Sequence, residues 1–141
     1  MEHVAIDLGG RKSQLCVRTA SGEILEEQAI ATDEIELYLR SRAACRVVVE
    51  ACTEAFRVAD AARGAGHEIR VVSTTLVRAL GVGARRTKSD ERDARALSEA
   101  SCRMDLPSVH VASERARERR SFLSMRDGLV QSRTQLIDSS I

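Results

Sequence analysis

Alternating and apolar stretches in the first half of the chain predict β-strands joined by short turns. Five stretches have this character, at residues 3–8, 13–19, 23–30, 45–49 and 68–72. The first three follow one another closely, with Gly9-Gly10 and Ser21-Gly22 in the turns, so they are expected to form an antiparallel meander. The stretch 45–49 is short and apolar throughout, which is typical of a buried strand in a parallel part of a sheet.

Helical patterns lie between and after these strands. Thr32 is expected to cap a first helix, because acidic residues follow in its first turn. A second helix is predicted over residues 54–63, a short turn or helix over 75–80, and a longer helix over about 89–104. A meander followed by strand–helix alternation is typical of a ribonuclease-H-like α/β fold, with a mixed five-stranded sheet and helices on its faces. The right-handed crossover rule places the fourth strand beside the first.

Apolar residues recur at heptad spacing near the end of the chain. They form two stripes, Phe122, Leu129 and Leu136, and Leu123, Val130 and Ile137. A helix beginning at Ser113 could pack back on the domain or begin a longer coiled-coil-like arm, and we favour the second interpretation. We therefore expect one domain over residues 1–106. Residues 107–141 are expected to be a linker and the start of a helical arm, through which copies associate, in a fragment of a longer protein.

The composition restricts the class of protein. A chain of 141 residues has room for one ordinary domain, and 43% hydrophobic with 30% charged residues excludes wholesale disorder. No apolar run approaches the ~18 residues needed to span a bilayer, and the start of the chain lacks a signal-peptide pattern. We therefore expect a cytoplasmic protein with no membrane partner. Aromatic residues make up only 2%, which disfavours a surface that stacks nucleic-acid bases on rings.

Four acidic residues are candidates for catalytic chemistry. Asp7 lies within the first predicted strand and Glu50 ends the fourth. Because these strands are expected to be parallel neighbours, both acids should lie at their carboxyl ends, where open α/β sheets place their sites. Asp90 and Asp93, spaced i and i+3, share one face of the predicted helix. If that helix crosses the same edge of the sheet, the four carboxylates converge.

Converging carboxylates require either raised pKa values or bound cations. Hard oxygen ligands select Mg²⁺ or Mn²⁺, and two such ions could promote phosphoryl transfer. Each acid also has an ordinary structural explanation. Asp90 and Asp93 could complement a helix dipole, and Glu50 could simply end a strand. Asp7 is the hardest to explain in this way, because an acid inside a strand is costly without a partner.

A basic segment precedes the helix that carries the two aspartates. It contains Arg85, Arg86 and Lys88. A phosphate backbone drawn to metal ions at the acids would pass close to these side chains, so they are candidate nucleic-acid contacts. A solvated basic loop is the alternative explanation.

Three stretches carry a resemblance to a known family. They are VAIDLGGRK at residues 4–12, VVVEAC at 47–52 and RTKSDERDARAL at 86–97, and the last is similar to a K-[ST]-D-x-x-D-A signature. In order and spacing they resemble the N-terminal domain of the insertion-sequence-110 transposases, whose relatives include the Piv-type DNA invertases. The resemblance covers essentially the whole chain.

The resemblance implies a RuvC-like DEDD nuclease domain that takes part in DNA transposition and recombination. It also implies that Asp7, Glu50, Asp90 and Asp93 form the metal-binding tetrad. Family members act on DNA, and at least some are guided by a structured RNA. They also carry a second domain with a serine nucleophile, so this chain is expected to be a fragment of a longer transposase.

Two other functions are compatible with parts of the sequence. The segment DLGGRK at residues 7–12 is similar to the first phosphate loop of sugar kinases and actin-like ATPases, which share the ribonuclease-H-like core. A second glycine-rich phosphate motif is missing, which disfavours this function. The other alternative is a non-catalytic module that binds nucleic acid or forms dimers.

Overall fold

A computed structural model describes residues 1–81 and 90–109 of the chain, without the side chains of residues 90–92. In this part of the chain five strands form one sheet: β1 (His3–Asp7), β2 (Lys12–Arg18), β3 (Ile24–Ala31), β4 (Arg46–Glu50) and β5 (Glu68–Val72). Its helices are η1 (Thr32–Glu34), α1 (Ile35–Arg40), α2 (Ala55–Gly64), α3 (Thr74–Ala79) and α4 (Asp90–Arg103).

The strands lie in the order β3-β2-β1-β4-β5. Strands β1, β2 and β3 pair antiparallel, which confirms the predicted meander. Strand β4 pairs parallel with β1, as the crossover rule predicts, and β5 extends the parallel part. The sheet is therefore mixed, and its parallel half has all carboxyl ends at one edge.

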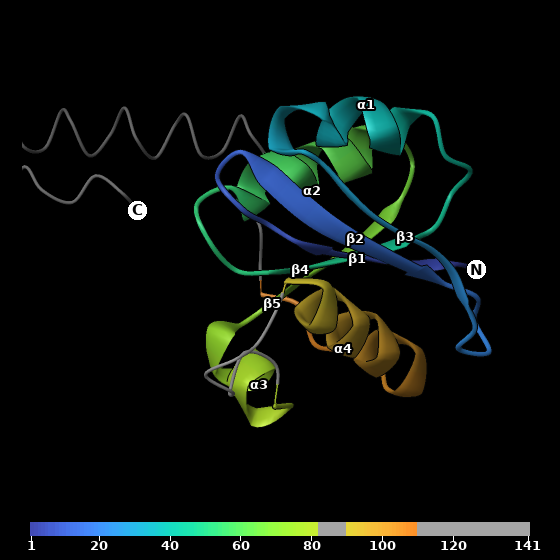
Figure 1. The fold of residues 1–141 in the computed structure, drawn as a ribbon, viewed down its shortest axis with the longest axis vertical. Coiled ribbons are helices and arrows are strands. Elements are labelled where there is room, and N and C mark those ends of the chain that lie inside the picture. The colour runs from blue at the N-terminus through green and yellow to red at the C-terminus, as the bar shows by residue number, and fades with distance from the viewer. Residues whose placement is uncertain (82–89, 110–141) are drawn as a thin grey trace, which may run out of the picture. The chain divides into compact units, whose positions relative to one another are not determined.

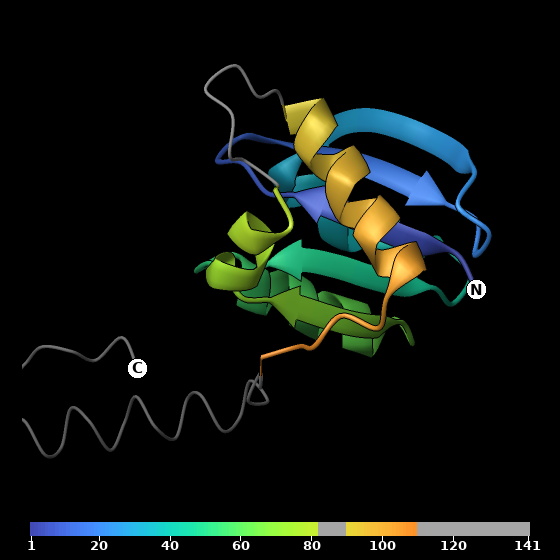
Figure 2. The same cartoon turned by 90° about the horizontal axis from the view of Figure 1, so that it is seen from below.

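Helices cover both faces of this sheet. Figure 1 shows α1 and α2 on one face and α3 and α4 on the other. Seen from below, α4 crosses the sheet obliquely, and it packs chiefly on β1 and β2 (Figure 2). This arrangement confirms the predicted five-stranded α/β architecture. None of the described helices is long and apolar enough to cross a membrane.

The core follows from the alternation of side chains along the central strands. Val47, Val48 and Val49 are fully buried, as expected for a strand covered on both faces. Ala5 and Val48 belong to a cluster of buried side chains on the face covered by α3 and α4, with Val72, Val77, Leu97 and Leu106. Full burial of one such aliphatic side chain stabilises the fold by about 1.5–3 kcal/mol. This packing fixes the position of α4 over the sheet.

One local prediction is corrected. Thr32 does not cap a helix, because neither η1 nor α1 has a side-chain cap bond at its start. Its hydroxyl instead binds the turn between β1 and β2. The residues that follow α4 also contact the sheet, because Leu106 is buried in the core cluster and Val109 N donates to Val71 O (2.8 Å). The Ser108 hydroxyl accepts a bond from Val71 N (2.8 Å).

Several predicted features lie outside the described residues. The chain divides into a compact unit, Met1–His110, and a second unit, Val111–Ile141, which is not described. The heptad stripes and the helix from Ser113 belong to that second unit. The basic residues Arg85, Arg86 and Lys88 also fall in a segment that is not described. These features, and the boundary after residue 106, stay predictions.

Candidate functional site

Two acids end neighbouring strands at the carboxyl edge of the sheet. Asp7 is the last residue of β1, and Glu50 is the last residue of β4. The register pairs Ile6 with Val49, so the two acids occupy equivalent positions one residue further along. Both residues are partly buried. The predicted proximity of these strand ends is therefore a property of the fold.

Both acids share a sheet face with α4. Side chains alternate along a strand, so Asp7 is on the same face as Ala5, and Glu50 is on the same face as Val48. Ala5 and Val48 are packed in one cluster with Leu97 of α4. The two carboxylates therefore belong to the face that α4 covers.

Helix α4 brings a third acid toward this edge. Near the end of the helix, Ser101 Oγ lies 2.6 Å from His3 Nδ1 at the start of β1. The first turns of α4 are therefore directed toward the carboxyl end of that strand. The eight steps along the helix from Asp93 to Ser101 span about 12 Å. The four steps along the strand from His3 to Asp7 span about 13 Å. Asp93 therefore belongs to the part of α4 nearest the carboxyl edge, and only 8% of it is exposed.

The fourth candidate acid is only partly described. Asp90 is the first residue of α4, but its side chain lies outside the described residues. Among the described side chains, no group of three or more histidine, cysteine, aspartate or glutamate residues could hold one metal ion. Asp7 and Asp93 each interact with other groups in this structure. Carboxylate oxygens are the donors that Mg²⁺ and Mn²⁺ prefer, so the chemistry of the site suits these ions.

The turn that follows Asp7 is unusually tight. A Cβ atom on Gly9 would lie 2.2 Å from the backbone oxygen of Lys12, so only glycine fits there. Two hydroxyl groups, those of Ser13 and Thr32, bind the backbone of Gly9. The sequence interpretation missed both hydroxyls. A signal was present in the glycine pair with a serine three residues later, but the contact with Thr32 joins residues 19 positions apart.

A groove lies between this turn and the helices α1 and α2. It has a volume of about 500 Å³ and is lined by the turn, by η1 and α1, and by α2. Its charged lining residues are of both signs: Arg11, Arg57, Asp33, Glu36 and Glu54. Arg57 Nη1 lies 3.7 Å from Glu54 Oε2, which partly neutralises the lining. The mixed charge does not favour one class of ligand.

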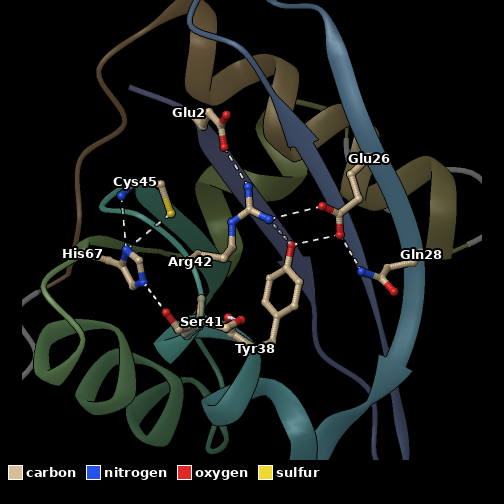
Figure 3. A network of polar contacts seen from close by, with 9 residues as sticks. Glu2, Glu26, Gln28, Tyr38, Ser41, Arg42, Cys45 and His67 are labelled. Atoms are coloured by element: carbon tan, nitrogen blue, oxygen red, sulfur yellow. Dashed lines mark hydrogen bonds and ion pairs between the residues drawn. The ribbon is translucent and has the colours of Figure 1, made fainter.

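The amino edge of the sheet is built differently. The guanidinium of Arg42 lies between Glu2 Oε1 (2.7 Å) and Glu26 Oε1 (3.1 Å), and it also donates to the Tyr38 hydroxyl at 2.8 Å (Figure 3). Burial raises the pKa of the Tyr38 hydroxyl above its usual range, so this group stays protonated. At this edge a partly buried cation and two acids are paired within the chain.

The buried side chain of His67 adds further hydrogen bonds at the amino edge. His67 Nε2 donates to Leu39 O (2.6 Å), so its Nδ1 is the acceptor for the Cys45 backbone N–H at 3.1 Å (Figure 3). Burial raises the pKa of the Cys45 thiol, which keeps this group protonated. These bonds connect the start of β4 with the loops beside it. They give the amino edge a structural role.

The sequence matches known transposases. The family DEDD_Tnp_IS110, described as a transposase, matches residues 4–141. The transposase for insertion sequence element IS1328 of Yersinia enterocolitica is 26% identical over 135 residues, which is 94% of this chain and 39% of that protein. A probable family 20 transposase of Pseudomonas aeruginosa is 26% identical over 136 residues, or 96% of this chain and 39% of that protein. The chain thus spans about two fifths of the length of these curated relatives.

The fold matches that of RuvC. The Thermus thermophilus RuvC structure superposes with a TM-score of 0.51 and 17% identity, over 77% of this chain and 100% of that one. T. thermophilus RuvC in complex with a Holliday junction substrate gives the same TM-score and identity, over 70% of this chain and 90% of that one. At this level of identity the similarity establishes the fold, which is the ribonuclease-H-like fold predicted from the order of elements.

Proposed function

The chain belongs to the IS110 family of DEDD transposases, and from that premise we propose that it is the metal-dependent domain that cleaves and transfers DNA strands in transposition. The proposal is supported by the transposase relatives and by the RuvC-like fold. The family match over residues 4–141 also favours this function over a phosphate-loop kinase.

We further propose that Asp7, Glu50, Asp90 and Asp93 hold Mg²⁺ or Mn²⁺. The observation that carries this proposal is the equivalent position of Asp7 and Glu50 at the carboxyl ends of two parallel strands, on the face covered by α4. The position of Asp93 supports it, because this acidic residue is only 8% exposed in α4, the helix that packs on β1. When bound, two such ions would activate an attacking oxygen and stabilise the leaving oxygen of a phosphodiester.

The protein would contribute geometry and charge to this reaction. Asp7 and Glu50 end central strands, and the residues just before them, Ile6 and Val49, are fully buried, so the backbone at both acids is held rigidly. Without a cation, four carboxylates gathered at this edge would repel one another. A divalent ion would draw them together. The tetrad would thus assemble only with its metal.

The partners of the domain follow from the same premise. DNA is the expected substrate, and RuvC, which shares the fold, is known in complex with a Holliday junction. We propose Arg85, Arg86 and Lys88 as contacts to the phosphate backbone, because they immediately precede the helix that carries two of the acids. A structured guide RNA, association through the C-terminal helical arm and a cytoplasmic location are proposed on the family resemblance.

The proposal is tested with two matched variants of the 141-residue chain. Asp7→Asn removes a proposed ligand, and Asp33→Asn removes an exposed acid of η1. Calorimetry with Mn²⁺ should show binding by the unchanged protein and by Asp33→Asn, and none by Asp7→Asn. Nicking of branched DNA in Mg²⁺ should follow the same order. DNA binding that needs no metal, together with no Mn²⁺ binding by the unchanged chain, would instead establish a non-catalytic nucleic-acid module.

A further inference from the structure

We propose that the hydroxyl groups of Ser13 and Thr32 are positioning residues for Asp7. They hold the turn after β1 in a single conformation, and so fix the direction in which Asp7 presents its carboxylate to a divalent cation. The inference rests on the proposed metal site. It adds two residues that are not acids and that would not contact the metal.

The two hydroxyls form a closed ring of hydrogen bonds with Gly9. Gly9 N donates to Ser13 Oγ (3.1 Å), and Thr32 Oγ1 donates to Gly9 O (2.8 Å). The two hydroxyl oxygens lie 2.8 Å apart. Because the Thr32 proton is used on a carbonyl, which can only accept, the Ser13 hydroxyl must donate to Thr32. Each member of the ring therefore donates once and accepts once, and such chains strengthen one another.

The ring closes the hairpin just beyond Asp7. Gly9 is two residues after Asp7, and Ser13 precedes Gln14, the residue of β2 that pairs with Asp7. Both backbone polar groups of Gly9 are held by the ring, so the chain has little freedom where it leaves β1. The backbone of Gly9 lies so close to Lys12 O that this position has no room for a side chain.

Thr32 anchors the ring to a third element. It follows β3, and its backbone N–H donates to Arg11 O (2.8 Å), which extends the pairing of β2 with β3 beyond the strands. Ser13 is only 3% exposed, so water cannot readily replace its bonds. The turn after Asp7 is therefore held from the start of β2 and from the end of β3. If Ser13 and Thr32 position Asp7, the presence of this hydrogen-bond network in a turn at the edge of the sheet is explained.

The test compares two substitutions at one position. Thr32→Ser keeps the hydroxyl, whereas Thr32→Val keeps the shape and removes it. Thr19→Val is the matched control, because Thr19 Oγ1 accepts from Glu23 N (3.1 Å) in the β2–β3 turn, at the opposite edge of the sheet. Mn²⁺ affinity of the 141-residue chain is measured by electron paramagnetic resonance. Chemical unfolding is followed in parallel.

We expect Thr32→Val to weaken Mn²⁺ binding by about 10- to 100-fold, the usual effect of losing a group that orients a metal ligand. Thr32→Ser should restore the affinity. Thr19→Val should bind Mn²⁺ as the unchanged protein does, even if its stability falls. Ser13→Ala, which adds no bulk, tests the ring from its other hydroxyl and should weaken binding in the same range.

The possible failures are distinguishable. If the unchanged chain binds no Mn²⁺, the proposed metal site is wrong and the positioning role falls with it. If the unchanged chain binds Mn²⁺, Asp7→Asn abolishes binding, and both Thr32→Val and Ser13→Ala bind normally, the metal site stands and the positioning role is wrong.

Discussion

The two edges of one sheet use acidic residues in different ways. At the amino edge, Glu2 and Glu26 share the guanidinium of Arg42, and Glu68 pairs with Arg46 at 2.7 Å. At the carboxyl edge, Asp7 and Glu50 end adjacent parallel strands, and Asp93 is buried in the helix above them. The first edge balances its charge with cations of the chain. We infer that the second edge is completed by a divalent ion, so it serves function where the first serves stability.

The largest effect is expected from removing an acid at the carboxyl edge. Asp7→Asn should lower Mg²⁺-dependent DNA cleavage more than about 100-fold, since loss of a mere outer partner of a metal ligand already costs 10- to 100-fold. Without metal the variant should still unfold cooperatively in urea, because asparagine nearly matches aspartate in size. Cleavage assays and urea unfolding check the two parts. Normal cleavage would reject the assignment of Asp7.

Removing Arg42, the central cation of the amino edge, should instead lower the free energy of unfolding and leave Mg²⁺-dependent cleavage unchanged. Arg42→Ala leaves Glu2 and Glu26 without their shared partner, and the Arg42 side chain is only 18% exposed. We expect a loss of about 2 kcal/mol in the free energy of unfolding, below the 3–5 kcal/mol typical of fully buried pairs. The matched variant Arg40→Ala breaks an exposed i,i+4 pair and should lose no more than about 0.5 kcal/mol. Equal losses in urea unfolding would contradict a special role for Arg42.

A third test addresses the basic residues that precede α4 in the sequence. Replacing Arg85, Arg86 and Lys88 by alanine should weaken DNA binding and reduce the slope of log affinity against log salt by about 2–3, since each phosphate contact contributes about 0.9. Three exposed arginines elsewhere serve as the control set: Arg40, Arg57 and Arg103. DNA affinity of both triple variants is measured at several salt concentrations. Equal slopes for both triple variants would leave the basic segment as ordinary surface.

The smallest effect is expected from one ion pair at the amino edge. The hydrogen bond from Arg46 lowers the pKa of the Glu68 carboxyl below its ordinary value of 4.5. The stabilisation is therefore complete above pH 4.5 and is lost as the pH falls through the lowered pKa. Because the Glu68 side chain is 42% exposed, we expect less than about 1 kcal/mol. Unfolding of Glu68→Gln and the unchanged protein should differ near neutral pH and converge in acid. A constant difference would contradict this role.

The sequence predicted the sheet because local patterns and topology agree there. Apolar strands, short turns and the crossover rule together require β4 beside β1, and this brings Asp7 and Glu50 to one edge. The helix expected from near Ser89 is confirmed as α4, which begins at Asp90. Its position over β1 depends on side-chain packing around Leu97, and the sequence pattern indicates only that a face is apolar.

The unpredicted features depend on contacts between distant residues. Thr32 has the residue type and the acidic neighbours of a helix cap, yet its hydroxyl binds Gly9, which is 23 residues earlier. Ser108 and Val109 bind the edge of β5, a contact that local composition around the only proline does not indicate. The tetrad itself stays a prediction. Topology places the strand ends that carry Asp7 and Glu50, whereas a closed metal site depends on side-chain positions and bound ions, which the pattern of apolar and polar residues does not determine.

The most direct test of the metal site is anomalous X-ray scattering from crystals soaked in Mn²⁺. We expect a peak at the carboxyl edge, with oxygens of Asp7 and of at least one of Glu50, Asp90 and Asp93 at about 2.0–2.3 Å from it. The peak should disappear in Asp7→Asn and persist in Asp33→Asn. Manganese bound only elsewhere, or no peak in crystals whose carboxyl edge is open to solvent, would contradict the central claim.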